Sequence, residues 1–137
     1  MSIDFSKVKL QVVDISTNYA PEMFINQNGV TFSKRVLEDL GYPQYVQYNT
    51  DPALSIFAIQ VCKGTGIRAV AFSKGKSEQN GTLSTGNKNL HDIIAALIPN
   101  FQPKTRYRVV GELDIANRVM YYDMKTAEIC PFRRVTE

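Results

Sequence analysis

Apolar and polar residues alternate with a period of two in several short stretches of this 137-residue chain. Such alternation predicts β-strands, because successive side chains of a strand point to opposite faces of a sheet. Clusters of Asn, Gly, Pro and Asp separate the stretches and favour turns. The strands predicted in this way are 6–15, 30–32, 45–49, 54–61, 69–72, 106–111 and 119–124.

Two segments instead repeat their apolar residues at helical spacing. The first is 34–40, where Ser33 is expected to cap the free amides of the first turn with its hydroxyl and Gly41 follows the last turn. The second begins after Asn87 or Asn89, either of which suits an N-cap. Its predicted buried stripe is Leu90, Ile93, Ile94 and Leu97.

The order of the elements recurs along the chain. Asn28-Gly29 is a strong hairpin signal because both residue types tolerate positive φ, and Asn80-Gly81 echoes it in the second half. Each dipeptide precedes strand, helix, proline, strand, turn and strand. One such unit cannot bury its apolar face alone, whereas two units can cover each other.

We therefore predict one β-rich α+β domain in which two pseudo-repeated strand–helix–hairpin units form a swapped-hairpin-like barrel, with an extra N-terminal strand. The chain then divides into an N-terminal strand region, a first unit, an exposed loop, a second unit and a tail. These segments are 1–27, 28–72, 73–79, 80–125 and 126–137.

The segment 30–61 resembles half of a swapped-hairpin DNA-binding domain of the AbrB/MazE/SpoVT superfamily. The matching residues are Val30-Thr31-Phe32-Ser33-Lys34, Val36-Leu37-Glu38-Asp39-Leu40-Gly41, 46–49 and 56–61. The superfamily usually has Pro where this chain has Ser33, and a Gly-Asp type of turn where it has Tyr42-Pro43-Gln44.

The resemblance implies that two halves interleave into a barrel and that basic residues near loops and helix starts reach DNA. Residues 80–124 would supply the second half within the same chain. Their stretch 83–88 departs further from the superfamily pattern.

Composition limits the compartment and the partners. Sixteen Lys and Arg against thirteen Asp and Glu give a net charge of +3, which permits an acidic partner without demanding one. No apolar run approaches the roughly 20 residues of a membrane helix, and the first residues lack the apolar core of a signal peptide. We expect a cytoplasmic protein without a membrane partner, with Cys62 and Cys130 as reduced thiols.

Basic residues provide the candidate nucleic-acid site. Some begin the two predicted helices, where free amides already favour phosphate. Others surround the glycine-rich central segment and could order on a phosphate backbone. The residues predicted to bind DNA are Lys34, Arg35, Arg68, Lys74, Lys76 and Lys88. The alternative is an ordinary solvated face.

A second set of arginines falls on the predicted strands of the second unit. Arg106 and Arg108 share a strand face, and Arg118 would join them from the neighbouring strand to make a basic stripe near Tyr121 or Tyr122. Such a stripe could hold a single nucleic-acid strand or a small anion. The alternative is that the arginines pair across strands with Glu112, Asp114 or Asp123.

No constellation typical of an enzyme is visible. His91 and Asp92 are adjacent, and adjacent helix residues do not face one another, so no working dyad is expected. One histidine and two distant cysteines provide no metal site. The chain also lacks a Gly-x-Ser-x-Gly elbow, a phosphate loop and a dinucleotide fingerprint.

The sequence thus predicts a non-enzymatic DNA-binding transcriptional regulator without a cofactor, acting as a homo-oligomer. Two alternatives stay open. One is a bacterial or phage accessory protein that acts by protein–protein interaction and assembly. The other is an oligomeric protein that binds a small, nucleotide-like anion.

Overall fold

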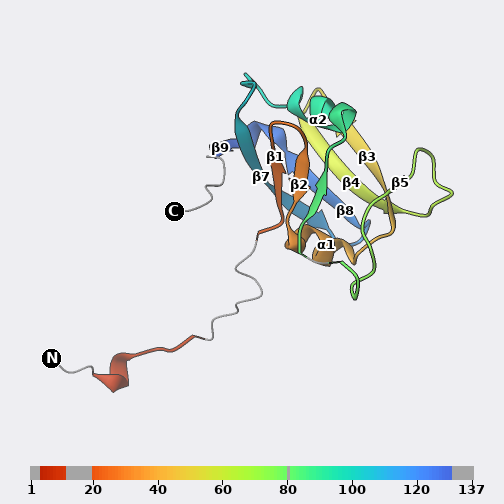
Figure 1. Cartoon of the computed structure of the whole chain (residues 1–137). Helices are drawn as coiled ribbons and strands as arrows, with labels where there is room; N and C mark the ends of the chain where they lie inside the picture. Colours follow the sequence, from red (N-terminus) through yellow and green to blue (C-terminus); the bar gives the residue numbers. More distant parts are fainter. Residues whose placement is uncertain (1–3, 12–19, 80, 131–137) are drawn as a thin grey trace.

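A curled antiparallel sheet forms the body of the protein (Figure 1). The structure, a computed structural model, describes residues 4–11, 20–79 and 81–130. Across the sheet the strands follow the order β5 (Val70–Ala71), β3 (Tyr45–Asp51), β4 (Ile56–Cys62), β8 (Val119–Asp123), β7 (Arg106–Asp114), β1 (Glu22–Ile25), β2 (Val30–Phe32) and β6 (Leu83–Thr85), and β9 (Glu128–Cys130) also pairs with β7. The helices are α1 (Lys34–Leu40) and α2 (Lys88–Ala95). The prediction of a β-rich α+β fold is confirmed.

The two helices lie at opposite ends of this half-barrel (Figure 1). Strands β2 and β6 pair antiparallel, so that Phe32 at the end of β2 lies opposite Leu83 at the start of β6. Because α1 follows β2 and α2 follows β6, the helices begin at opposite ends of this strand pair. No helix in the described part of the chain is long and apolar enough to cross a membrane.

A series of aromatic contacts joins the two sides of the curled sheet. The ring of Phe32 on β2 lies 5.5 Å from that of Phe72, which directly follows β5. Phe72 lies 6.5 Å from Tyr48 on β3, and Tyr48 stacks at 5.7 Å on Phe57 of β4. Phe57 in turn lies 6.0 Å from Tyr122 on β8. These rings pack inside the curled sheet and connect the segment after β5, at one edge, to β2, which is next to the other edge.

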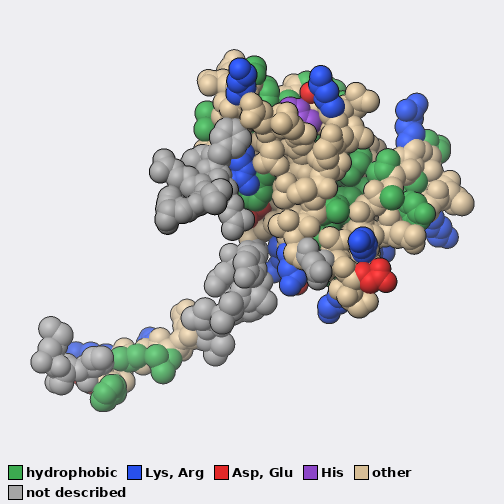
Figure 2. Space-filling model, viewed as in Figure 1, with side chains coloured by type: hydrophobic (Ala, Val, Ile, Leu, Met, Phe, Trp, Pro, Cys, Tyr) green, Lys and Arg blue, Asp and Glu red, His purple; other side chains and the backbone are tan. Residues whose placement is uncertain are grey.

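The predicted N-terminal strand 6–15 is wrong over its described part. Residues Phe5–Lys7 form a short 3-10 turn (η1), and 8–11 belong to no strand, while 12–15 lie outside the described residues. Phe5 is 82% exposed, and Figure 2 shows hydrophobic side chains of 4–11 standing away from the body. Alternating apolar residues allow a strand to bury one face, but they form a strand only where a neighbouring strand is available. The described part of this segment pairs with no strand.

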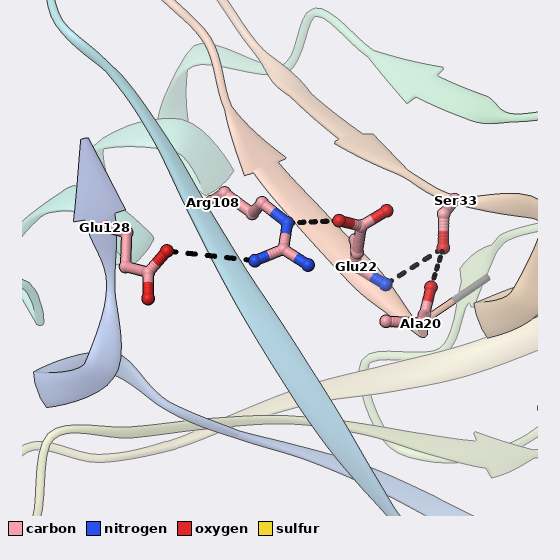
Figure 3. A network of polar contacts seen from close by, with 5 residues as sticks. All are labelled: Ala20, Glu22, Ser33, Arg108 and Glu128. Carbon is pink, nitrogen blue, oxygen red and sulfur yellow. Dashed lines mark hydrogen bonds and ion pairs between the residues drawn. The ribbon is translucent and has the colours of Figure 1, made fainter. Parts of the chain in front are cut away.

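The prediction of a helix over 34–40 is confirmed, but the predicted role of Ser33 is wrong. Its hydroxyl makes no capping bond to α1. It donates to the carbonyl oxygen of Ala20 at 3.0 Å and accepts from the amide of Glu22 at 2.9 Å (Figure 3). Ser33 therefore fastens the start of β1 to the start of α1.

Replacing Ser33 by alanine is expected to lower the free energy of unfolding by about 1–3 kcal/mol, because a part-buried amide and carbonyl lose their partner. Urea unfolding followed by circular dichroism measures this loss. Ser33→Asp is the discriminating variant, since Asp is an excellent N-cap but its carboxylate cannot donate to Ala20. Full stability of Ser33→Asp would contradict the bridging role.

In α2, Asn87 is the N-cap, and its Oδ1 accepts from the amide of Leu90 at 3.1 Å. The predicted buried stripe is partly wrong, because Ile93 is 52% exposed whereas Leu90, Ile94 and Leu97 are buried. The helix covers one end of the barrel with a single face, and Ile93 lies outside that face.

The Asn-Gly hairpin forms for a different reason from the predicted one. Strands β1 and β2 are joined by residues 26–29, and the amide of Asn26 donates to the carbonyl oxygen of Gly29 at 2.8 Å. Neither Asn28 nor Gly29 has a positive φ. Glycine is instead required at 29 because a Cβ there would lie 2.3 Å from the carbonyl oxygen of Thr85 on β6.

The strands predicted at 45–49, 54–61, 69–72, 106–111 and 119–124 are confirmed as β3, β4, β5, β7 and β8 with shifted ends, whereas β1 and β9 are not among the predicted strands. The segment 73–79 is mostly exposed as predicted, but Ser73 is buried and donates to the carbonyl oxygen of Pro43 at 2.6 Å. The predicted tail contains β9, which pairs with the first residues of β7. Cys62 and Cys130 are free thiols, each half-buried.

Candidate nucleic-acid interface

The residues predicted to bind DNA do not form one cluster. Lys34 is exposed at the start of α1, and Lys88 is exposed at the start of α2, at the opposite end of the barrel. Lys74 and Lys76 are exposed in the segment between β5 and β6, and Lys76 lines a surface hollow beside the C-terminal end of α1. Arg68 is exposed in the loop between β4 and β5. Figure 2 accordingly shows Lys and Arg side chains scattered over the visible face.

Arg35 differs from its neighbour Lys34 because it is engaged within its own helix. Its Nε lies 2.7 Å from Oδ1 of Asp39, one turn further along α1. A phosphate at Arg35 would therefore share the guanidinium with Asp39 or displace it.

The structure does not bring Arg118 to Arg106 and Arg108. Arg118 lies in the turn between β7 and β8, at the other end of β7, and its Nη2 donates to the carbonyl oxygen of Leu40 at 2.8 Å. It thereby closes the C-terminal end of α1. The predicted basic stripe is wrong for this residue.

Arg108 is part of an ionic network on the outer face of the sheet (Figure 3). Its Nε donates to Oε2 of Glu22 on β1, and its Nη1 lies 3.8 Å from Oε2 of Glu128 on β9. The predicted alternative of cross-strand pairing is therefore right in kind. Its partners are different from the predicted ones, because β1 and β9 are the neighbours of this part of β7.

A polar groove of about 540 Å³ opens on the outer face beside β2 and β6. It is bounded by the β1–β2 loop, the end of β6 and the start of β7. Its lining residues are Asn26, Gln27, Asn28, Gly29, Val30, Thr31, Ser84, Thr85, Gly86 and Arg106. No carboxylate lines it, so the groove carries one formal positive charge and many hydrogen-bonding groups.

A chain of hydrogen bonds crosses this groove. Nε of Arg106 donates to Oδ1 of Asn26 at 3.0 Å, and Nδ2 of Asn26 donates to Oγ1 of Thr31 at 2.9 Å. Oγ1 of Thr31 lies 2.9 Å from Oγ of Ser84. The guanidinium of Arg106 also lies 4.2 Å from the ring centre of Phe24, in a cation–π contact. Contacts among residues on or next to β1, β2, β6 and β7 thus hold these side chains in place without a ligand.

Helix α2 supports the loop that forms one wall of the groove. Nε2 of His91 donates to the carbonyl oxygen of Asn26 at 2.8 Å. Its Nδ1 lies 3.1 Å from Oδ1 of Asp92, so the expectation that these adjacent side chains do not meet is wrong. A second hollow, of about 350 Å³, adjoins the groove and adds Lys88 to the same surface.

Replacing Gly29 by alanine is expected to separate the β1–β2 loop from β6, because the new methyl group would meet a backbone oxygen that cannot rotate away. We expect a loss of about 1–3 kcal/mol of stability together with altered amide shifts at Thr85 and Gly86. Gly86→Ala is the matched control, since a Cβ there meets nothing within 4 Å. Equal effects of the two substitutions would contradict the close approach of the loop to β6.

Sequence reasoning identified Arg106 but missed Phe24, Asn26, Thr31 and Ser84. The signal that could have found two of them is their position, since Thr31 and Ser84 stand at the middle of the corresponding strands that follow the two Asn-Gly dipeptides. Within the described residues, no group of His, Cys, Asp and Glu could hold a metal ion.

Comparison with protein-family models finds no match for this chain, and comparisons with curated proteins and with solved structures find none either.

Proposed function

We propose that the protein binds double-stranded DNA, without catalysing a reaction, through the outer face of β2 and β6 and the two helix starts that flank it. The observation that carries this proposal is the placement of Lys34 and Lys88. Each stands just beyond the end of β2 or β6, so one exposed cation lies at either end of a polar strand pair.

We also propose that the chain contains an internal pseudo-repeat, whose two units are related by an approximate two-fold axis as in the swapped-hairpin superfamily. The order strand, helix, strand, strand occurs as β2–α1–β3–β4 and again as β6–α2–β7–β8. Corresponding strands pair antiparallel, β2 with β6 and β4 with β8, which is what a two-fold axis requires. The central pairs of these ladders are Thr31 with Ser84 and Ala58 with Tyr121.

The two hairpin turns support the same relation. Oδ1 of Asp51 accepts from the amide of Leu54 at 3.3 Å, and Oδ1 of Asp114 accepts from the amide of Asn117 at 3.3 Å. The next residue has a positive φ in both turns, 55° at Ser55 and 53° at Arg118. The connection from helix to hairpin is longer in the second unit, 96–105 against 41–44, which accounts for its greater length.

A two-fold arrangement suits duplex DNA, whose two backbones are themselves related by two-fold axes. Basic residues on either side of the axis can meet one phosphate strand each, and the polar groove between them offers further donors. Phosphate neutralisation of this kind makes affinity strongly dependent on salt.

Fluorescence anisotropy with a duplex of random sequence at 50 and 200 mM salt tests the proposal. We expect binding that weakens steeply with salt. The double variant Lys34→Gln/Lys88→Gln should bind more weakly and lower the salt slope by about two, one for each phosphate that is no longer neutralised. Lys63→Gln/Arg68→Gln removes the same charge from the exposed loop after β4 and should leave both quantities unchanged.

Two results would overturn the proposal. One is the absence of duplex binding by the unsubstituted protein at low salt. The other is an equal loss of affinity in both double variants, because attraction would then follow net charge rather than this face.

A second candidate function is self-assembly through the outer face of β7 and β8. Val110 and Tyr121 are exposed there by 41% and 42%, on the side of the sheet that neither helix covers. Light scattering on the unsubstituted protein and on Tyr121→Ser decides this: a dimer that Tyr121→Ser dissociates supports assembly, and a monomer removes it.

A further inference from the structure

We propose that the groove beside β2 and β6 is a phosphate-binding site in which the terminal nitrogens of Arg106 form the principal donor pair. The inference rests on the proposed function in so far as the groove lies on the proposed DNA face. It goes further by assigning the ligand group and the atoms that hold it.

Arg106 is pre-positioned for such a ligand. Its guanidinium stacks on Phe24 and its Nε is used by Asn26. Within the part of the chain that the structure describes, its Nη1 and Nη2 make no hydrogen bond or ion pair to protein, and the residue lines the groove. A planar guanidinium held by its Nε and one face presents its two terminal nitrogens as a fork, the geometry that pairs with two phosphate oxygens.

The hydroxyl pair of Thr31 and Ser84, which also lines the groove, supplies a further donor. Thr31 and Ser84 together hold two hydroxyl hydrogens, and the bond between their oxygens uses one of them. Oγ1 of Thr31 already accepts from Asn26. The remaining hydroxyl hydrogen therefore has no acceptor in this chain of bonds, and Ser84 is exposed to the groove. An acceptor-only group such as phosphate satisfies both this hydrogen and the arginine fork.

The charges around the groove favour an anion. The nearest arginine on the same face, Arg108, is neutralised by Glu22 and Glu128, whereas no carboxylate lines the groove beside Arg106. The adjoining hollow adds Lys88 and one acid, Asp92. Arg106 and a set of neutral donors thus face a volume of about 540 Å³, which accommodates a phosphate with part of the group that carries it, and Lys88 lies in the hollow beside it.

The phosphate could belong to a DNA backbone or to a free nucleotide, and the experiment separates these sources. Backbone amide spectra of the 15N-labelled protein are recorded with sodium phosphate or with adenosine monophosphate, against sodium chloride of equal ionic strength. Duplex affinity is measured in parallel by anisotropy. The variants are Arg106→Lys, which keeps the charge but loses the fork, and Arg108→Lys as the matched control on the same strand face.

We expect phosphate to shift the amides of Ser84, Thr85 and Gly86, and Arg106→Lys to weaken that binding by about tenfold or more, with Arg108→Lys unchanged. A parallel loss of duplex affinity in Arg106→Lys assigns the phosphate to a DNA backbone. If Arg106→Lys loses nucleotide binding but keeps its duplex affinity, the phosphate is that of a free nucleotide. The proposed DNA face is then tested separately by the Lys34→Gln/Lys88→Gln variant. Phosphate shifts that are absent, or equal in Arg106→Lys and the unsubstituted protein, overturn the inference.

Discussion

Replacing Phe32 by alanine is expected to lower the free energy of unfolding by about 3–5 kcal/mol, the usual result of removing a buried phenylalanine ring. Phe32 is fully buried, and its ring contact with Phe72 links β2 to the segment that follows β5. The substitution therefore removes transfer energy and leaves a cavity where the two sides of the curled sheet meet. Urea unfolding at neutral pH measures the difference.

Phe5→Ala is the control for this experiment, because the same side chain is removed from a position that is 82% exposed. Its free energy of unfolding should stay within about 0.5 kcal/mol of the unsubstituted protein. Since domains of this kind are stable by only about 5–15 kcal/mol, Phe32→Ala should remove a large share of the total stability. Equal losses in the two variants would show that the ring contact does not close the barrel.

Stability is expected to fall as the pH rises above 10, because the aromatic series contains one fully buried tyrosine, Tyr122, and one partly buried tyrosine, Tyr48. Burial raises the pKa of Tyr48 to about 12 from the ordinary 10. Burial, followed by the charges of Asp39 and Tyr48, raises the pKa of Tyr122 well above its usual range. Above pH 10 the unfolded chain releases these protons and the folded chain keeps them, so the unfolded state gains.

For Tyr48 the loss is about 1 kcal/mol at pH 11 and approaches about 3 kcal/mol above pH 12, since each pKa unit corresponds to about 1.4 kcal/mol. The measurement is the difference in unfolding free energy between pH 8 and pH 11. Tyr48→Phe should lose less stability over this interval than the unsubstituted protein, whereas Tyr121→Phe, which removes an exposed phenol, should match it. Identical pH dependence in Tyr48→Phe and the unsubstituted protein would contradict the burial of that hydroxyl.

The sequence predicts α1 and the longer strands well, because the residues that determine them lie within or next to each element. The bounds of α1 follow from Gly41, which takes the left-handed conformation with φ of 79°, and from the spacing of Val36, Leu37 and Leu40. The alternation of β3, β4, β7 and β8 is equally clear in the sequence. The N-terminal segment alternates in the same way but pairs with no strand over its described residues. The alternation alone does not distinguish a segment that has a partner strand from one that has none.

The candidate site is only partly predictable because it depends on strand neighbours. Arg106 and Lys88 are identifiable from the sequence as basic residues on a strand and at a helix start. Thr31 and Ser84 meet only because β2 pairs with β6 in one register. The sequence pattern places Arg118 in a stripe with the other arginines, whereas the hairpin carries it to the far end of β7.

The most direct test of the proposed function is a titration of the 15N-labelled protein with a short duplex, with each shifted amide assigned to its residue. We expect the largest shifts on β2, β6 and the two helix starts, at Thr31, Lys34, Ser84 and Lys88, and none in the loop that holds Arg68. Shifts confined to the outer face around Val110 and Tyr121, or to the Arg68 loop, would contradict the account, because the DNA would then bind a different surface of the barrel.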